Sequence, residues 1–290
     1  MLIERLDVAP DMLGESPVWD PLAATLYWVD TVNRKVRAYH PASGRESFWM
    51  TPSVVGSIAL GEDDSLIVAL QDGFYRLRLE TSQVELLWRV EADDPRTRFN
   101  DGKLDRAGRF LCGSMGIHAE PLGALYRFSH GRAAQRLADG VRISNALCFS
   151  PAGDVMYFAD SLSREIRAYD YDVDGDRIGE PRQLIDTNQF GSGPDGATVD
   201  AEGYLWVALV QAGRLARISP QGTVDGIVDL PVDMPTCPAF GGPDFATLYV
   251  TSIKDSGTGR AVSKHPDGGS VFALKDVGVR GLPEARFHFG

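Results

Sequence analysis

Four oxygen-bearing side chains occupy the same place in a repeated stretch of this sequence. In each repeat a polar turn leads from one short apolar run to the next, as in residues 193–206. Counting back five residues from the turn residues Asp20, Asp105, Ser150 and Asp200 gives Glu15, Asn100, Asn145 and Asp195. The same count from Gly61 and Gly242 gives Gly56 and Cys237. Four of the six equivalent positions therefore carry a carboxylate or an amide.

Two carboxylates and two amides that meet at one point favour a metal site. Oxygen-only ligation suits a hard divalent cation such as calcium, magnesium or manganese. Zinc is an alternative, although it usually takes nitrogen or sulfur ligands. An ion held by three protein groups keeps positions open for water and substrate, which Lewis-acid catalysis requires. The other interpretation is that these polar residues simply cap the ends of strands.

The repeat also predicts the architecture. A period of roughly 40–50 residues with several short strands per unit is typical of a propeller blade. We predict an all-β fold, a six-bladed β-propeller with four antiparallel strands per blade, in a single domain spanning residues 1–290. The predicted blades cover residues 14–50, 56–90, 98–138, 143–185, 194–230 and 237 to the end, and a strand within residues 2–8 completes the last blade.

This ring explains how distant residues would meet. The innermost strand of each blade begins at the mouth of the central channel. Because the four oxygen-bearing residues lie at the predicted starts of these strands, we expect them to converge on one axis. The tryptophans in strand runs are predicted to fill the core between blades; they are Trp28, Trp49, Trp88 and Trp206.

Composition narrows the classes of partner. The chain has 290 residues, 43% of them hydrophobic, and a formal net charge of −11. An acidic surface repels nucleic acid and anionic membranes, so neither is an expected partner. No apolar stretch is long enough for a bilayer helix, and the N-terminus lacks a secretion-signal pattern, so a cytoplasmic location is expected. The odd number of cysteines (Cys112, Cys148 and Cys237) favours buried free thiols. Composition carries no signal for an oligomeric state.

Six motifs in this order and spacing resemble the regucalcin/gluconolactonase family, also called the senescence-marker-protein family. They span nearly the whole chain, at residues 14–19 (GESPVW), 98–103 (RFNDGK), 143–145 (ISN), 160–163 (DSLS), 194–196 (PDG) and 240–242 (FGG). The resemblance implies a six-bladed propeller that hydrolyses a small-molecule sugar lactone with one divalent metal ion. It implies that Glu15, Asn145 and Asp195 are the metal ligands and that Arg98 and Asn100 hold the sugar.

The sequence departs from the family in blade 3. Family members often carry a substrate-facing acidic residue after the Gly-Ser/Thr-Met segment, and here residues 113–115 are followed by a loop that puts His118 near that place. His118 is therefore a candidate donor to a substrate hydroxyl, or else a solvated loop residue. Asp101 is a further candidate beside the substrate, or a residue that fixes the blade 3 turn.

Opening a cyclic ester requires a polarised carbonyl and a deprotonated water. In this interpretation the metal ion stabilises the oxyanion. Asp195 is the candidate general base. Arg98 offers a rigid fork of donors for sugar hydroxyls or for the new carboxylate. Two rival functions stay open: a phosphotriesterase-like hydrolase that uses the same site, and a non-catalytic calcium-binding propeller.

Overall fold

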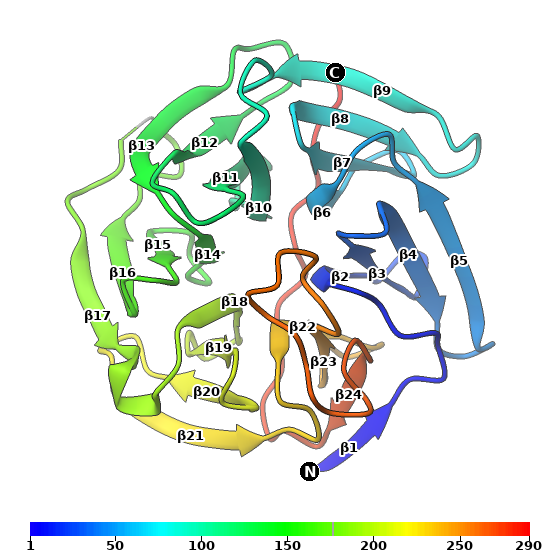
Figure 1. Ribbon diagram of the computed structural model, residues 1–290, viewed down its shortest axis with the longest axis vertical. Coiled ribbons are helices and arrows are strands. Elements are labelled where there is room, and N and C mark those ends of the chain that lie inside the picture. Colours follow the sequence, from blue (N-terminus) through cyan, green and yellow to red (C-terminus); the bar gives the residue numbers. More distant parts are fainter. Residues whose placement is uncertain (176) are drawn as a thin grey trace.

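The protein forms a ring of blades around a central channel (Figure 1). The computed structural model describes residues 1–175 and 177–290, and these form six four-stranded sheets. Within each sheet, neighbouring strands are antiparallel and follow one another along the chain, except in the last blade. The prediction of a six-bladed, all-β propeller is thereby confirmed.

Each blade is built from an inner strand at the channel outwards. The inner strands are β2 (Gly14–Asp20), β6 (Val55–Leu60), β10 (Thr97–Leu104), β14 (Ser144–Phe149), β18 (Pro194–Val199) and β22 (Pro235–Gly241). The second strands are β3 (Thr25–Asp30), β7 (Ser65–Leu70), β11 (Phe110–Gly116), β15 (Val155–Asp160), β19 (Leu205–Leu209) and β23 (Thr247–Ser252). The third strands are β4 (Lys35–His40), β8 (Gly73–Arg78), β12 (Gly123–Phe128), β16 (Glu165–Asp170), β20 (Arg214–Ile218) and β24 (Phe272–Lys275). The outer strands are β5 (Arg45–Met50), β9 (Val84–Arg89), β13 (Gln135–Val141), β17 (Arg182–Asp186), β21 (Val224–Asp229) and β1 (Leu2–Arg5).

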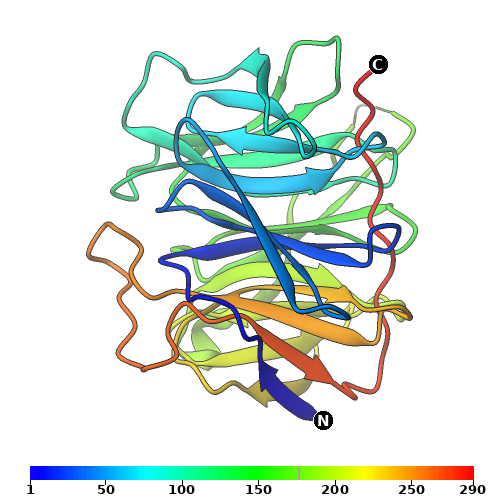
Figure 2. The ribbon, with the colours of Figure 1, turned by 90° about the vertical axis from the view of Figure 1, so that its right-hand side faces the viewer.

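The two ends of the chain meet in the last blade. Strand β1 pairs with β24, so the N-terminal strand supplies the outer strand of this sheet and removes an exposed edge, as predicted. The prediction that this blade continues to the end of the sequence is wrong, because its last strand ends at Lys275. Residues 276–290 instead cross the ring on the face opposite the long loop of residues 253–271 (Figure 2).

Apolar side chains between neighbouring blades hold the ring together. Within the described residues they form six clusters, each shared by two adjacent blades, so that the clusters close the circle. Trp28 and Trp206 are fully or almost fully buried there, as predicted. Trp49 is partly buried, whereas Trp88 is 41% exposed, because it lies on β9, an outer strand that faces solvent.

The turn that defines the repeat is held by its own polar residue. The carboxylate of Asp105 accepts hydrogen bonds from the backbone amides of Ala107 and Arg109, at 3.0 and 2.9 Å. Asp200 does the same in blade 5, and in both turns a glycine three residues on has a φ near +80° that favours glycine. The turn therefore fixes where each inner strand ends and the second strand begins.

Helix is nearly absent from the part of the chain that the structure describes. It contains one short 3₁₀ helix, η1 (Thr187–Phe190), between blades 4 and 5. No helix among these residues is long and apolar enough to cross a membrane. The three cysteines are buried and free, as their number suggested.

Candidate active site

A cavity of about 280 Å³ opens at the mouth of the channel, where the inner strands begin. It lies at the lower end of the size range of small-molecule sites, roughly 300–1,000 Å³. Five of the predicted site residues line it together, although they come from four blades: Glu15, Arg98, Asn100, Asn145 and Asp195. The convergence predicted from their equivalent places in the repeat is thus present. Their roles in binding and catalysis stay predictions.

The backbone is irregular at the places that carry these residues. The pairing of each inner strand with its neighbour is interrupted near its start, directly after Glu15 and Asn145 and around Asn100 and Asp195. A bulge of this kind re-aims side chains that would otherwise alternate between the faces of a sheet. The residues that follow Glu15 and Asn145 have φ values of +50° and +52°, which are unusual for residues other than glycine.

Two equivalent positions carry no oxygen ligand, and the structure gives a reason for one. A β-carbon on Gly56 would lie only 2.4 Å from the carbonyl oxygen of Phe99, so β6 and β10 approach too closely for a side chain there. Cys237 fills the space beside Gly196, where an added β-carbon would lie 2.4 Å from its Sγ. Its thiol lines the interior of the channel below the cavity.

Hydrogen bonds fix the orientation of both amides. The Nδ2 of Asn145 donates to Ser161 Oγ at 2.8 Å, and Ser161 Oγ donates to the carbonyl of Pro194 at 2.7 Å. The oxygen of the same amide, Asn145 Oδ1, therefore points away from Ser161. It accepts a hydrogen bond from Asn100 Nδ2 at 3.1 Å. Asn100 in turn accepts from Arg98 Nη1 at 2.8 Å. The chain of contacts links blades 3, 4 and 5 at the cavity.

The two carboxylates in the cavity are held in an unfavourable environment for their charges. Burial raises the pKa of Glu15 well above its usual range; Asp195 and Asp101 raise it further, and Arg98 lowers it. Burial, and then Asp101, also raise the pKa of Asp195. Burial lowers the pKa of Arg98, and these carboxylates offset that only in part. Within residues 1–175 and 177–290, neither Glu15 nor Asp195 forms an ion pair with a side chain.

Two predicted residues do not line this cavity. Asp101 lies deeper in the channel, where its Oδ2 accepts from the backbone amide of Leu147 at 2.8 Å and burial raises its pKa to about 6. This bond ties blade 3 to blade 4. The side chain of His118 is exposed, but its backbone carbonyl accepts a hydrogen bond from Arg260 at 2.6 Å. Both assignments as substrate-binding residues stay predictions.

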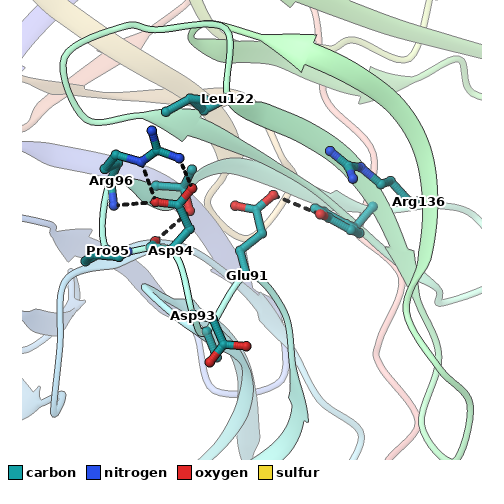
Figure 3. Close-up of a pocket in the computed structure, with 10 residues that line it drawn as sticks. Glu91, Asp93, Asp94, Pro95, Arg96, Leu122 and Arg136 are labelled. Atoms are coloured by element: carbon teal, nitrogen blue, oxygen red, sulfur yellow. Dashed lines mark hydrogen bonds and ion pairs between the residues drawn. The ribbon is translucent and has the colours of Figure 1, made fainter.

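A second hollow, of about 600 Å³, lies at the edge of blade 3 around the segment between β9 and β10 (Figure 3). Two of its three carboxylates, Asp94 and Glu91, already have partners. Asp94 binds Arg96 through two hydrogen bonds of 2.8 and 2.7 Å. Glu91 accepts from the hydroxyls of Ser114 and Tyr126, both at 2.8 Å. These contacts explain Asp94 and Glu91 structurally, and none of the predicted site residues lines this hollow, so the cavity at the channel mouth is the candidate site.

Comparison with known proteins identifies the family. Residues 13–254 match the SMP-30/gluconolactonase/LRE-like region. The chain belongs to this family. It is 36% identical to regucalcin from Gallus gallus over 95% of this chain and 94% of the relative. It is also 36% identical to a 6-deoxy-6-sulfogluconolactonase from Pseudomonas putida, over 96% of each chain. A crystal structure of regucalcin from Agrobacterium tumefaciens, described as a calcium-binding protein, superposes with a TM-score of 0.91 at 30% identity, covering 98% of this chain and 96% of that chain.

The donor set of this family member fits a divalent cation. The described residues contain no cluster of three or more histidine, cysteine, aspartate and glutamate side chains, so a nitrogen- or sulfur-rich centre is not present among them. Two carboxylates that form no ion pair among the described residues and one amide oxygen of fixed orientation are instead a hard, oxygen-only set. Ser161 orients the amide through its other end, as neighbours of metal ligands commonly do.

Among the other residues that line the cavity are Ser161, Arg164 and Arg260, to which sequence reasoning gave no role in the site. Ser161 lies inside a motif that resembles the family, so its position gave a usable signal. Arg164 lies in the turn between β15 and β16, and Arg260 in the long loop between β23 and β24. No repeat position or motif marks these two arginines, because they approach the cavity only through the loops that carry them.

Proposed function

We propose that this protein hydrolyses a sugar lactone to its aldonic acid with the help of one divalent cation. The observation that carries the proposal is the pair of carboxylates, partly buried Glu15 and buried Asp195, which share a small cavity with a fixed amide and form no ion pair among the described residues. Relatives named regucalcin and 6-deoxy-6-sulfogluconolactonase support the assignment, since the latter name describes lactone hydrolysis.

Glu15, Asn145 and Asp195 are the residues that would hold the cation. When bound there, a divalent cation supplies Lewis-acid chemistry by polarising the lactone carbonyl and stabilising the oxyanion of the tetrahedral intermediate. The hydrogen bond from Asn145 Nδ2 to Ser161 keeps the amide oxygen directed at the site without reorganisation.

Asp195 is the proposed general base. Its carboxylate takes a proton from the water that attacks the lactone carbonyl carbon, and the ring C–O bond then breaks as the ring oxygen gains a proton. A base with a pKa raised above the usual aspartate range is a stronger proton acceptor than an ordinary exposed carboxylate.

Arg98 and Asn100 are proposed to hold the sugar. One guanidinium nitrogen of Arg98 is committed to Asn100 Oδ1 and to the carbonyl of Phe99, at 2.8 and 2.9 Å. This fixes the plane of the guanidinium, whose other donors serve ring hydroxyls and the carboxylate formed on hydrolysis.

The test is acid release from a panel of sugar lactones by cation-stripped protein, with calcium, magnesium, manganese or zinc added back one at a time. We expect activity only with a cation, and a loss of about a thousandfold in kcat/KM for Asp195→Asn, as for removal of a general base. Asn145→Ala should also lose most activity. The control is Glu284→Gln, which alters a carboxylate outside the cavity.

Other outcomes would favour the rival functions. Tight cation binding without hydrolysis of any lactone supports a calcium-binding propeller, a role named for the Agrobacterium relative. Turnover of phosphotriesters in preference to lactones supports the second hydrolase. Full lactonase activity in both Asp195→Asn and Asn145→Ala would show that the site is wrongly assigned.

A further inference from the structure

We propose that Arg164 and Arg260 form an anion-binding subsite at the outer end of the cavity, so that the preferred lactone carries a negatively charged group on the carbon farthest from the reacting carbonyl. This inference rests on the proposed lactonase function and specifies its substrate class. It is argued from the position, partners and charge of the two arginines.

Arg164 lines the cavity and forms no ion pair with a carboxylate within the described part of the chain. It lies at the end of the turn at residues 161–164, in the left-handed region with a φ of +54°. Its backbone carbonyl accepts two hydrogen bonds from Thr187, through the amide at 2.8 Å and through Oγ1 at 2.9 Å, which anchor the turn. The side chain is exposed and lines the cavity, and no ion pair holds it within the described part of the chain.

Arg260 reaches the cavity from another blade of the ring. It lies in the loop at residues 253–271, which projects from blade 6 over the channel mouth (Figures 1 and 2). Its Nη1 donates to the backbone carbonyl of His118 in blade 3 at 2.6 Å, so the loop is braced across the mouth. Since that partner is a neutral carbonyl, the positive charge of Arg260 stays uncompensated.

The charges along the cavity are segregated. The inner end carries the carboxylates Glu15 and Asp195, where the cation is proposed to bind. The lining of the outer end contains two arginines and, among the residues that the structure describes, no carboxylate. A neutral sugar lactone gives no reason for two unpaired guanidinium groups at the far end of its site, because hydroxyls are served equally well by neutral donors.

An anionic group on the distal carbon matches this pattern. With the lactone carbonyl at the inner end, the opposite end of a monosaccharide faces outwards, towards Arg164 and Arg260. Guanidinium groups recognise sulfonate, phosphate and carboxylate oxygens through charge-assisted hydrogen bonds. Two arginines from different blades would also fix the long axis of the substrate in the cavity.

The chain offers a matched control for Arg164. Arg34 ends the equivalent turn in blade 1, with a φ of +56°, and its carbonyl likewise accepts from the amide and Oγ1 of Thr51. Arg34 does not line the cavity. The two arginines therefore share backbone, exposure and charge and differ in what they face.

The experiment measures kcat/KM of the cation-loaded protein for gluconolactone and for its counterparts with a sulfonate, a phosphate or a carboxylate on the distal carbon. The readout is the kcat/KM for each anionic lactone divided by the kcat/KM for the neutral lactone. We expect ratios above one that decrease with added salt. Arg164→Gln and Arg260→Gln should each lower the ratio about tenfold, Arg164→Glu should lower it further, and Arg34→Gln should leave it at the wild-type value. The lactone with the highest ratio identifies which anionic group, sulfonate, phosphate or carboxylate, the subsite prefers.

A ratio of one or less for all three anions, or equal ratios in Arg164→Gln and Arg34→Gln, would overturn the subsite while leaving lactonase activity intact. Absence of any lactonase activity would instead refute the proposed function. In that case calorimetric binding of gluconate and of its distally phosphorylated form still tests the subsite. Tighter binding of the phosphorylated acid that is lost in Arg260→Gln supports it, and equal binding contradicts it.

Discussion

Both ends of the central channel hold charged side chains that are at least partly buried. Among the described residues, the charges at the far end form ion pairs, whereas the carboxylates at the mouth do not. At the far end, Lys103 Nζ lies 3.2 Å from one carboxylate oxygen of Glu284, and Arg106 Nη1 lies 3.8 Å from the other. Burial alone would lower the pKa of Lys103, but Glu284, together with smaller contributions from groups that include Asp101, outweighs burial and the pKa is raised. At the mouth the directions are reversed: the carboxylates have raised pKa values and Arg98 has a lowered one.

The available space differs as well. The hollows that Lys103 and Glu284 line are only about 10 Å³ each, roughly the room for one water molecule, whereas the mouth opens into 280 Å³. Paired charges in a filled space stabilise the packing of residues 276–290 against the far end of the channel. Unpaired charges in an open space destabilise the isolated protein and are a recurrent mark of a functional site. The contrast supports a structural role for the far end and the proposed lactonase site at the mouth.

The largest effect concerns the pH dependence of cation binding. Because Glu15 and Asp195 must release protons before a cation binds, affinity should fall about tenfold per pH unit for each proton taken up below their raised pKa values. From pH 7 to pH 5 we expect affinity to fall, by at most about a hundredfold for each proton taken up, or about 2.7 kcal/mol. Calorimetric titration of chelator-treated protein measures this. Constant affinity over that range would mean that the pair ionises like ordinary carboxyls.

The second-largest effect is a loss of stability at the far end of the channel, where Lys103 pairs with Glu284. Glu284→Gln leaves Lys103 in the channel without its carboxylate, and removing one partner of a mostly buried pair destabilises the fold. Because both side chains keep some solvent contact, we expect a loss of about 2 kcal/mol in the free energy of unfolding, below the range for fully buried pairs. Denaturant melts measure it, and cation affinity should stay at the wild-type value. Lost cation binding with unchanged stability would reverse the assignment of the two ends.

A smaller effect is expected for the residue that orients Asn145. Ser161→Ala removes the acceptor of the Asn145 amide and should lower cation affinity about tenfold, as for other neighbours of metal ligands. Thr31 is a matched control, because it occupies the equivalent place in blade 1 and its buried Oγ1 has no hydrogen-bond partner within the described structure. Thr31→Val should bind the cation as tightly as wild type. Equal losses in both variants would point to the turns and not to the amide.

Position in the repeat explains why the inner end of the site was predictable. Glu15, Asn145 and Asp195 sit at fixed offsets from turns whose geometry is set locally by the turn residues, so a count along the sequence locates them in space. Arg164 and Arg34 close turns of the same length and conformation, yet only Arg164 lines the cavity. What separates them is the neighbourhood of each blade, which the repeat does not encode.

Segments outside the repeat were predicted least well. The loop that carries Arg260 runs over residues 253–271, far longer than its counterparts at residues 31–34 and 161–164, so the repeat gives no position for it. Residues 276–290 were expected within the last blade. Phe287 and Phe289 instead pack into the apolar cluster between blades 2 and 3, where burial of two aromatic rings outweighs a further edge pairing. Long-range packing of this kind leaves no local pattern in the sequence.

The smallest expected effect is a change in the free energy of unfolding. Its sign should be opposite for a substitution at the mouth and for one at the far end of the channel. Asp195→Asn removes one of two like charges buried at the mouth, so in cation-free protein above pH 7 it should raise the free energy of unfolding by about 1 kcal/mol, whereas Glu284→Gln lowers it. The pH dependence of stability explains why removing this charge stabilises the cation-free protein. A carboxyl whose folded-state pKa is raised stabilises the fold below its ordinary pKa, and this contribution is lost as the pH rises through the raised value. The gain should therefore vanish near pH 4 and reverse when wild type is saturated with the cation that the variant no longer binds. Paired denaturant melts at pH 4 and pH 8, with chelator and with cation, measure all of these differences. If Asp195→Asn is less stable than wild type in cation-free protein at pH 8, then the carboxylate of Asp195 is stabilised by a positive charge, as Glu284 is at the far end.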